Sequence, residues 1–587
     1  MACAANGTHG EDRGGYETTA SRQSDGRLSL LVGVAGYSEA GGELSDTGRR
    51  YDRRTFLARG AGSAAALAVA GVGGPTMLSA STQPGIGIGG PRRGGTINVG
   101  MNSEIDGFLP SASHFDNTGI TYASTVFDSL TVRAANGEAR PYLAQSVTSN
   151  PDYTTWTITL RPNVTFHDSS PLTADVVVAN FQAIRSSALT GQAVKPISGV
   201  KAVGDLQVVF TCNEPLVAFP QYLATQLGYV VALSQLESSN STHPIGTGPF
   251  RYVSWVPNDH FTVEANPNYW RRGVPYLDGI TFRPIIDDDS RQSSLLAGTI
   301  DLMVSHDPNA IATLRRNSSF QLVDDLNQST GQPDMDFICL NVTAPPLNDL
   351  TVRQALAHAT NAKEIVKLFG AGVTPVTSSL YPPGSPYRPA HNGYPTYDLA
   401  KAKRLVAQAA PRHGGAIKLT LGDIPDPRQL EIIQALQSMW MQAGFHVSLT
   451  DVQQVTYIDN LVTGNFQAYA DEQFSAADPD LNYVWLSETT ASGPIALNFA
   501  RNKDPKLEAA LQHGRTHADP AVRAEAYQTV DKLLAKDLPY LWLSRAPWSM
   551  SASNKVQNFA GPTLPSGGRA EGFRAGTFTT SQIWLKG

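Results

Sequence analysis

Cysteine is almost absent from this sequence. The 587 residues include three cysteines, Cys3, Cys212 and Cys339, and none of them stands in a CxxC spacing. A structural zinc site and a framework of several disulfides both need more cysteines than this. The spacing leaves open whether Cys212 and Cys339 pair in an oxidising compartment or stay as buried thiols.

An excess of positive charge is also lacking. Lys and Arg total 45 and Asp and Glu total 51, which gives a net charge of -6. No basic run and no alternation of basic and aromatic residues offsets this balance, so the charge pattern argues against a nucleic-acid partner. The content of 41% hydrophobic and 16% charged residues is typical of a soluble globular protein.

Long apolar runs are missing apart from one short run near the N-terminus. Residues 60–74 are mostly Ala and Gly, and they fall short of the roughly 20 strongly apolar residues of a spanning helix. Arg53 and Arg54 stand ahead of this run, followed by Phe56 and Leu57. The segment 51–82 therefore resembles a twin-arginine signal peptide. The alternative is a chance Arg-Arg pair before a core helix.

The segments around this signal carry no pattern of a folded domain. Residues 1–50 lack apolar periodicity and are interpreted as disordered or as an over-extended gene start, and residues 83–95 as a flexible leader. No cysteine stands between residues 4 and 211, which excludes a lipid anchor at this signal. We expect a soluble mature protein that is periplasmic or extracellular; the sequence leaves open which.

Strand and helix patterns alternate in the rest of the chain, which is too long for one ordinary core. In "TTWTITL", residues 154–160, apolar residues recur at every second position, as in a strand buried on one face. A helix capped by Thr173 follows, and a second helix over 427–443 ends at Gly444 before another strand. These units indicate an α/β fold with mixed sheets in two or more lobes. The predicted buried positions are Trp156, Ile158 and Leu160 in the strand, Val176, Val177, Asn180, Phe181 and Ile184 in the first helix, and Leu430, Ile433, Leu436, Trp440 and Ala443 in the second.

The stretch "IGTGPF", residues 245–250, has the glycine content of a phosphate-binding loop but not its chemistry. A P-loop needs Lys and Ser or Thr at the start of a helix, and a dinucleotide fingerprint needs a third glycine before a helix. Here Pro249 follows the glycines and the strand-like "FRYVSW" comes next. The stretch is therefore interpreted as a structural turn that leads into a sheet.

Motifs of catalysis are missing as well. HExxH does not occur, and the nearest match to a nucleophile elbow, residues 36–40, lacks the final glycine. The acidic run Asp287–Ser290 favours a helix cap over a cation site, and His306 with Asp307 favours a solvated pair in a loop. We predict no enzyme activity, no cofactor and no metal.

Six motifs occur in an order that resembles a known family. They include "LRPNVTFHD" at 160–168, "IGTGPF" at 245–250, "NPNYW…PYLD" within 266–278 and "ADPDLNYVW" at 477–485. Together they resemble the extracellular solute-binding proteins of the peptide/nickel ABC-importer family, often called family 5, over roughly residues 94–560. In that family "FHD" lies in a structural turn, so the resemblance implies that His167 and Asp168 are structural.

The resemblance implies a large periplasmic-binding-protein fold in which two lobes close on a solute. By analogy, lobe I covers 96–338 with an insertion subdomain at about 127–243, lobe II covers 339–545, and residues 546–587 return to lobe I. A hinge is expected near Phe337–Asn341 and Leu543–Pro547. The implied partners are a small solute and the permease and ATPase subunits of an importer, and we expect a monomer.

The resemblance places the ligand site near "EQFSAADPDLNYVW", residues 472–485. Peptide binders of this family carry an aromatic residue and then an Asp that pairs with the ligand amine. Here Phe474 keeps the aromatic, Ser475 stands near the Asp position, and Asp471, Glu472 or Asp478 is left as a substitute. Nickel binders carry His where Asp480 stands, which disfavours nickel. The ligand-binding candidates are Tyr122, Arg388, Phe474, Ser475, Asp478, Asp480, Tyr483 and Trp485; for the aromatic residues the alternative is core packing, and for Arg388 an exposed surface position.

The predicted function is the substrate-binding subunit of an ABC importer for dipeptides, oligopeptides or a similar medium-sized solute. Two alternatives stay open. The protein could be a secreted sensor or carrier that is not dedicated to transport, or its solute could be a sugar or a metal chelate.

Overall fold

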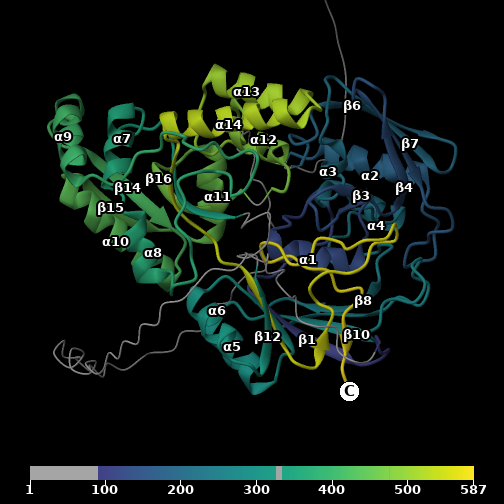
Figure 1. The fold of residues 1–587 in the computed structure, drawn as a ribbon. Coiled ribbons are helices and arrows are strands. Elements are labelled where there is room, and N and C mark those ends of the chain that lie inside the picture. The colour runs from purple at the N-terminus through teal and green to yellow at the C-terminus, as the bar shows by residue number, and fades with distance from the viewer. Residues whose placement is uncertain (1–89, 189, 325–333, 475) are drawn as a thin grey trace, which may run out of the picture. The chain divides into compact units, whose positions relative to one another are not determined.

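The computed structural model describes residues 90–188, 190–324, 334–474 and 476–587 (Figure 1). The predicted signal residues Arg53, Arg54, Phe56 and Leu57, and the candidate Ser475, lie outside the described residues. Within the described part, no helix combines the length and the apolar character that crossing a membrane requires.

A seven-stranded mixed sheet is built from both halves of the chain. Strand β1 is parallel to its neighbours β10 and β11, and β18, which comes from the C-terminal part, pairs antiparallel between β11 and β12. Aromatic side chains of Phe108, Tyr122, Phe261 and Phe282 form part of its buried core. The strand order is β12 (Phe320–Asp324), β18 (Ser549–Ser553), β11 (Leu302–Ser305), β1 (Thr96–Met101), β10 (Gly279–Pro284), β9 (His260–Ala265) and β8 (Phe250–Val256).

The stretch at 245–250 is a turn into β8, which confirms its structural interpretation. A Cβ on Gly246 would lie 2.0 Å from the carbonyl oxygen of Val126, and one on Gly248 would lie 2.5 Å from the Val126 carbonyl carbon. Only glycine permits such a close approach of two backbone segments. The nearby His167 is structural too, because its Nε2 lies 3.1 Å from the carbonyl oxygen of Gly248.

A four-stranded antiparallel sheet carries the first predicted strand and helix. The five predicted helix positions are buried, as are Trp156, Ile158 and Leu160 in the strand, so both patterns are confirmed. Thr173 stands at the N-cap of α2 (Ala174–Ser186), but its side chain makes no capping hydrogen bond, which corrects that expectation. The strand order is β4 (Ala144–Ser149), β5 (Thr155–Leu160), β7 (Gln207–Cys212) and β6 (Ile197–Val203).

A five-stranded mixed sheet carries the second predicted helix and the strand that follows it. Strands β14, β15 and β16 are parallel, and β13 pairs antiparallel with β16 and β17. Helix α10 (Pro427–Ala443) connects β14 to β15 and ends at Gly444 with a φ of 104°. Four of its predicted core residues are buried, but Leu430 is 41% exposed, so that position was predicted wrongly. The strand order is β15 (His446–Asp451), β14 (Lys418–Asp423), β16 (Ala468–Gln473), β13 (Met335–Leu340) and β17 (Tyr540–Arg545).

Figure 1 shows further helices around each sheet. Asp287 caps α5 by accepting a hydrogen bond from Ser290 N (2.7 Å), which confirms the helix-cap interpretation. Cys212 and Cys339 lie in different sheets and are both free. The remaining helices are α1 (Asn117–Val126), α3 (Phe219–Tyr222), α4 (Leu233–Ser238), α5 (Asp288–Ala297), α6 (Pro308–Arg315), α7 (Leu350–Ala359), α8 (Ala362–Phe369), α9 (Leu399–Ala409), α11 (Gln454–Thr463), α12 (Tyr483–Leu486), α13 (Pro505–Thr516), α14 (Pro520–Asp537), and the 3-10 helices η1 (Gln226–Gly228), η2 (Ala410–His413), η3 (Pro479–Asn482) and η4 (Glu488–Thr490). Two small two-stranded sheets pair β2 (Thr131–Arg133) with β3 (Ala139–Pro141) and β19 (Val556–Gln557) with β20 (Trp584–Leu585).

Candidate ligand-binding cavity

A cavity of about 250 Å³ lies at the carboxyl ends of β14 and β16, and we call it the β14–β16 cavity. In α/β proteins, ligands bind outside the carboxyl ends of parallel strands, where polar side chains from separate strands meet. Helices α8, α10 and α11 supply apolar and polar walls, and His306, which follows β11 of the seven-stranded sheet, also lines it. Its ionisable lining residues are His306, Asp336, Asp423, Arg428, Tyr457, Asp471 and Glu472.

The local sequence explains why charged side chains lie at the β14–β16 cavity. Strand β14, "KLTLGD", alternates apolar residues and ends on Asp423. The next helix, α10, is capped by Asp426, whose side chain accepts a hydrogen bond from Gln429 N, and this places Arg428 in its first turn. Strand β16, "AYADEQ", carries the carboxyls of Asp471 and Glu472 near its C-terminal end.

Two carboxyls of the cavity stand directly opposite each other in the sheet. The register of β13 and β16 pairs Asp336 with Glu472, and like charges in such a pair are destabilising. Burial raises the pKa of both groups above their ordinary values, and Arg428 works in the opposite direction. Each of the two has a partner: Asp336 accepts a hydrogen bond from the Ser544 hydroxyl, and Glu472 accepts one from Trp548 Nε1 (2.9 Å).

Two other carboxyls are only half satisfied. Asp423 is 4% exposed; its Oδ1 accepts a hydrogen bond from Ile424 N (2.7 Å), while its Oδ2 has no partner. Asp471 Oδ1 accepts one from Glu472 N (3.0 Å), and its Oδ2 is likewise without a partner. Burial raises the pKa of each carboxyl to about 7, and the charge of Asp471 adds to the rise at Asp423.

The basic groups of the cavity are also unpaired. Within the described residues, the Arg428 Nε has no hydrogen-bond acceptor and its guanidinium forms no ion pair. His306 Nδ1 is without a partner, and its ring centroid lies 4.9 Å from that of Trp548. Burial lowers the pKa of His306 to about 3, so its imidazole is neutral at pH 7. His306 is therefore part of a cavity wall, which corrects its interpretation as a solvated loop residue.

Five unpartnered polar atoms thus gather on one cavity: Thr374 Oγ1 and the four atoms named above, on His306, Asp423, Arg428 and Asp471. A buried polar atom without a partner costs about 1–3 kcal/mol, and native proteins contain few of them. A solute with matching donors and acceptors would remove this cost. The arrangement is suited to binding.

The aromatic candidates lie in apolar surroundings. Phe474 is 4% exposed, and its ring centroid lies 5.3 Å from that of Phe337. Tyr122 is 1% exposed, with its ring centroid 4.9 Å from that of Phe282, and Trp485 contacts Phe499. Arg388 Nη1 donates a hydrogen bond to the carbonyl oxygen of Tyr381 (3.1 Å). None of these four lines the cavity, and their contact with a ligand stays a prediction.

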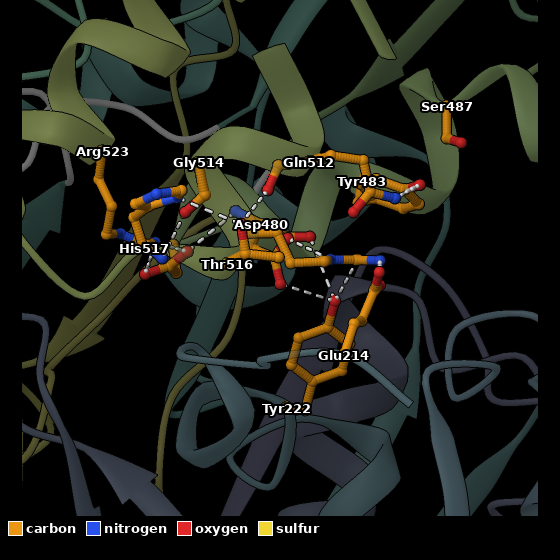
Figure 2. Close-up of polar contacts among 12 residues, drawn as sticks. Glu214, Tyr222, Asp480, Tyr483, Ser487, Gln512, Gly514, Thr516, His517 and Arg523 are labelled. Atoms are coloured by element: carbon orange, nitrogen blue, oxygen red, sulfur yellow. Dashed lines mark hydrogen bonds and ion pairs between the residues drawn. The ribbon is translucent and has the colours of Figure 1, made fainter. Parts of the chain in front are cut away.

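The candidates Asp480 and Tyr483 belong to a second buried polar group, which we call the Arg515 cluster (Glu214, Tyr222, Asp480, Tyr483 and Arg515). Arg515 Nε donates to Asp480 Oδ1 (2.8 Å) and its Nη2 to the Tyr222 hydroxyl (3.0 Å), which in turn donates to Asp480 Oδ2 (3.0 Å). The guanidinium carbon lies 3.4 Å from the ring centroid of Tyr483, and Nη1 lies 3.5 Å from Glu214. Figure 2 shows the side chains of Tyr222 and Glu214 reaching the cluster from a ribbon segment that belongs to an earlier part of the chain, with Tyr222 directed toward Asp480.

Asp478 has a comparable structural partner. Its carboxylate accepts two hydrogen bonds from Arg523 Nη2 (2.6 and 2.8 Å), and its Oδ1 also accepts one from Asp480 N at the start of η3. Of the three acidic substitutes that the sequence offered for an amine clamp, Asp471 and Glu472 line the cavity and Asp478 does not. Sequence reasoning missed Asp336, Asp423 and Arg428, although an acidic residue directly after a buried strand was a usable signal for Asp423.

Comparison with known proteins identifies the family. The family described as bacterial extracellular solute-binding proteins, family 5 Middle, matches residues 138–494. The glutathione-binding protein GsiB of Pectobacterium atrosepticum is 28% identical over 433 residues, which cover 71% of this chain and 82% of the relative.

Solved structures agree on the fold. The periplasmic binding protein DppA of Helicobacter pylori, in complex with the peptide STSA, has a TM-score of 0.74 and 22% identity over 84% of this chain and 99% of that one. The oligopeptide-binding protein AppA of Bacillus subtilis, in complex with a nonapeptide, has a TM-score of 0.73 and 22% identity over 85% and 100%. These likenesses confirm the predicted α/β periplasmic-binding-protein fold with mixed sheets. The chain belongs to family 5 of the bacterial extracellular solute-binding proteins, which bind solutes for ABC importers and are not enzymes.

Proposed function

We propose that this protein binds a short peptide or a peptide-like solute in the β14–β16 cavity and delivers it to the permease of an ABC importer. The observation that carries the proposal is the group of five unpartnered polar atoms around one cavity of about 250 Å³. The relatives named above support the peptide class, because one is named for glutathione and two are in complex with peptides.

The size of the cavity favours a small solute. The cavity has a volume of about 250 Å³. This is below the usual range of about 300–1,000 Å³ for drug-sized ligands. A dipeptide or tripeptide suits this volume better than a long oligopeptide.

The charges of the cavity suit the two ends of a peptide. Asp471 and Asp423 each offer a free carboxylate oxygen to an ammonium group. Arg428 offers a guanidinium without an ion pair, and guanidinium groups bind carboxylates through two parallel hydrogen bonds. A zwitterion is therefore recognised at both ends.

The way in which the cavity walls are assembled supports the closure of two lobes around the solute. His306 comes from beside the seven-stranded sheet, whereas the other ionisable lining residues lie in or beside the five-stranded sheet. The chain passes from β17 in the five-stranded sheet to β18 in the seven-stranded sheet, and a rotation at such a crossing would open the cavity. The predicted lobes at 96–338 and 339–545, the segment 546–587, and export through the twin-arginine signal at 51–82 are parts of this proposal.

Isothermal titration calorimetry with dipeptides, tripeptides and glutathione tests the proposal. We expect at least one of them to bind, and Asp471→Asn to weaken its binding at least tenfold. Asp451→Asn is a matched control, because Asp451 ends the neighbouring strand β15 but is exposed and does not line the cavity. If no peptide bound while a sugar or a metal chelate did, the peptide assignment would be wrong.

A further inference from the structure

The lining of the β14–β16 cavity holds more acidic than basic side chains. Its lining contains four carboxyls, Asp336, Asp423, Asp471 and Glu472, and one guanidinium, Arg428. His306 is neutral at pH 7, since burial lowers its pKa to about 3. A zwitterionic ligand with one ammonium and one carboxylate would leave this excess of acid uncompensated.

The unpartnered atoms show which carboxyls are available to a positively charged group. Asp336 and Glu472 have hydrogen-bond donors in Ser544 and Trp548. By contrast, Asp423 is 4% exposed and presents an unpartnered Oδ2 to the cavity, and Asp471 presents a second. In the parallel register Gly422 is level with Tyr469, so Asp423 lies level with Ala470 and Asp471 lies one residue further along β16. Both unpartnered oxygens belong to residues that line the same cavity, so positively charged groups of one solute can reach each of them.

We propose that the β14–β16 cavity selects a compact cationic solute, a basic amino acid or a short basic peptide, whose positively charged groups bind the unpartnered oxygens of Asp423 and Asp471 and whose carboxylate is held by Arg428. The inference rests on the proposed function, since it names the substrate class of the same site. A metal ion fits less well, because no group of three or more His, Cys, Asp or Glu side chains among the described residues is arranged to hold one.

The protonation of Asp423 and Asp471 makes ligand binding depend on pH, and this dependence can be measured on the unaltered protein. Burial raises the pKa of Asp423 and Asp471 to about 7, so both hold protons in part of the neutral range when the cavity is empty. Acidic groups that face them raise the pKa further, Asp471 and Asp426 at Asp423 and Asp334 at Asp471, whereas the Tyr457 hydroxyl on α11 lowers the pKa of Asp471. A cation favours the ionised carboxylates, so its binding releases protons and weakens as the pH falls from 8 to 6.

Calorimetry of the full-length protein with three dipeptides of equal length tests the charge preference. At pH 8, lysyl-alanine is expected to bind at least tenfold more tightly than alanyl-alanine, and glutamyl-alanine more weakly than both. Asp423→Asn should lower the affinity for lysyl-alanine at least tenfold and shrink its advantage over alanyl-alanine, whereas Asp451→Asn should change neither. Circular dichroism checks that each variant is folded.

The outcomes separate this inference from the proposed function. Equal or tighter binding of alanyl-alanine or glutamyl-alanine would overturn the charge preference and leave the peptide function intact. Binding of 1,5-diaminopentane without any dipeptide would support the preference for cations and overturn the peptide function. If lysyl-alanine bound equally well at pH 6 and pH 8 and released no protons, the role of Asp423 and Asp471 would be refuted even if the variants failed to fold.

Discussion

The Arg515 cluster and the β14–β16 cavity both hold carboxylates that are shielded from water, but their partners differ. In the Arg515 cluster, Asp480 is 0% exposed and bonds to a guanidinium and to the Tyr222 hydroxyl. In the cavity, Asp423 is nearly as buried, yet one of its oxygens is unpartnered and Arg428 forms no ion pair within the described chain.

The contrast separates structural charges from charges that are available to a ligand. A buried ion pair that is fully bonded keeps its ionised form, whereas an unpaired buried carboxyl holds its proton up to a higher pH. The pKa values follow this rule: burial raises the pKa of Asp423 to about 7, while Asp480 and Tyr222 outweigh the effect of burial on Arg515 and raise its pKa. Unpaired groups reduce stability, and they persist in proteins where function needs them.

The largest effect is expected from Arg515→Met. This change keeps much of the side-chain volume but leaves the carboxylate of Asp480 buried without its cation. Removing one partner of a buried pair costs about 3–5 kcal/mol. The free energy of unfolding, measured in urea, should fall by this amount.

An exposed pair provides the control for this measurement. Arg140 and Glu138 form an ion pair whose side chains are 49% and 60% exposed, and such pairs contribute about 0–1 kcal/mol. Arg140→Met should therefore change the free energy of unfolding by no more than about 1 kcal/mol. If both substitutions cost the same, the Arg515 cluster would not be the structural element described here.

A smaller effect of opposite sign is expected from Asp423→Asn in the ligand-free protein. The folded-state pKa of Asp423 is about 7, above the usual value of about 3.9, so the unfolded chain loses this proton first as the pH rises. Wild-type stability should then fall between about pH 4 and pH 7, by about 4 kcal/mol at most. The variant should be more stable at pH 8 by about 1–3 kcal/mol, and the gain should vanish near pH 4.

Urea unfolding of both proteins at pH 8, 6 and 5 measures this difference. A gain that stayed constant with pH would mean that Asp423 is ionised throughout, and a loss at pH 8 would mean that its carboxylate is already paired. The matched variant Asp451→Asn should show neither a gain nor a pH dependence, since Asp451 is exposed.

The helices, strands and turns of this fold could be predicted where the pattern that specifies them lies in residues close together in the sequence. Apolar spacing in α10 predicted the burial of Ile433, Leu436 and Trp440, which are at most 1% exposed. It was wrong for Leu430, in the first turn, because periodicity gives the direction of a helix face but not how far the neighbouring structure covers it. The turn at Gly246 and Gly248 could be predicted from the residues that follow it.

The site could be predicted only in part. Similarity to family 5 led to the segment around 471–485, and Asp471 and Glu472 of that segment line the cavity. Asp478 and Asp480 in the same segment are instead paired with Arg523 and Arg515. The partners come from residues far along the chain, as does the pairing of Asp336 with Glu472 across the sheet. Sequence spacing does not give such contacts, so it cannot separate paired from unpaired carboxylates.

The smallest effect on stability is expected from Arg428→Gln, together with a selective effect on binding. Arg428 has no ion pair to lose within the described residues, so the free energy of unfolding should change by less than about 1 kcal/mol. A hydrogen bond to a charged group contributes about 1.5–3 kcal/mol, so lysyl-alanine should bind roughly 10- to 100-fold more weakly. The affinity for 1,5-diaminopentane, which has no carboxylate, should stay the same or rise, because a positive charge has left an acidic cavity. Calorimetry with both probes decides the matter: an equal loss for the two would show that Arg428 shapes the cavity rather than holding a carboxylate.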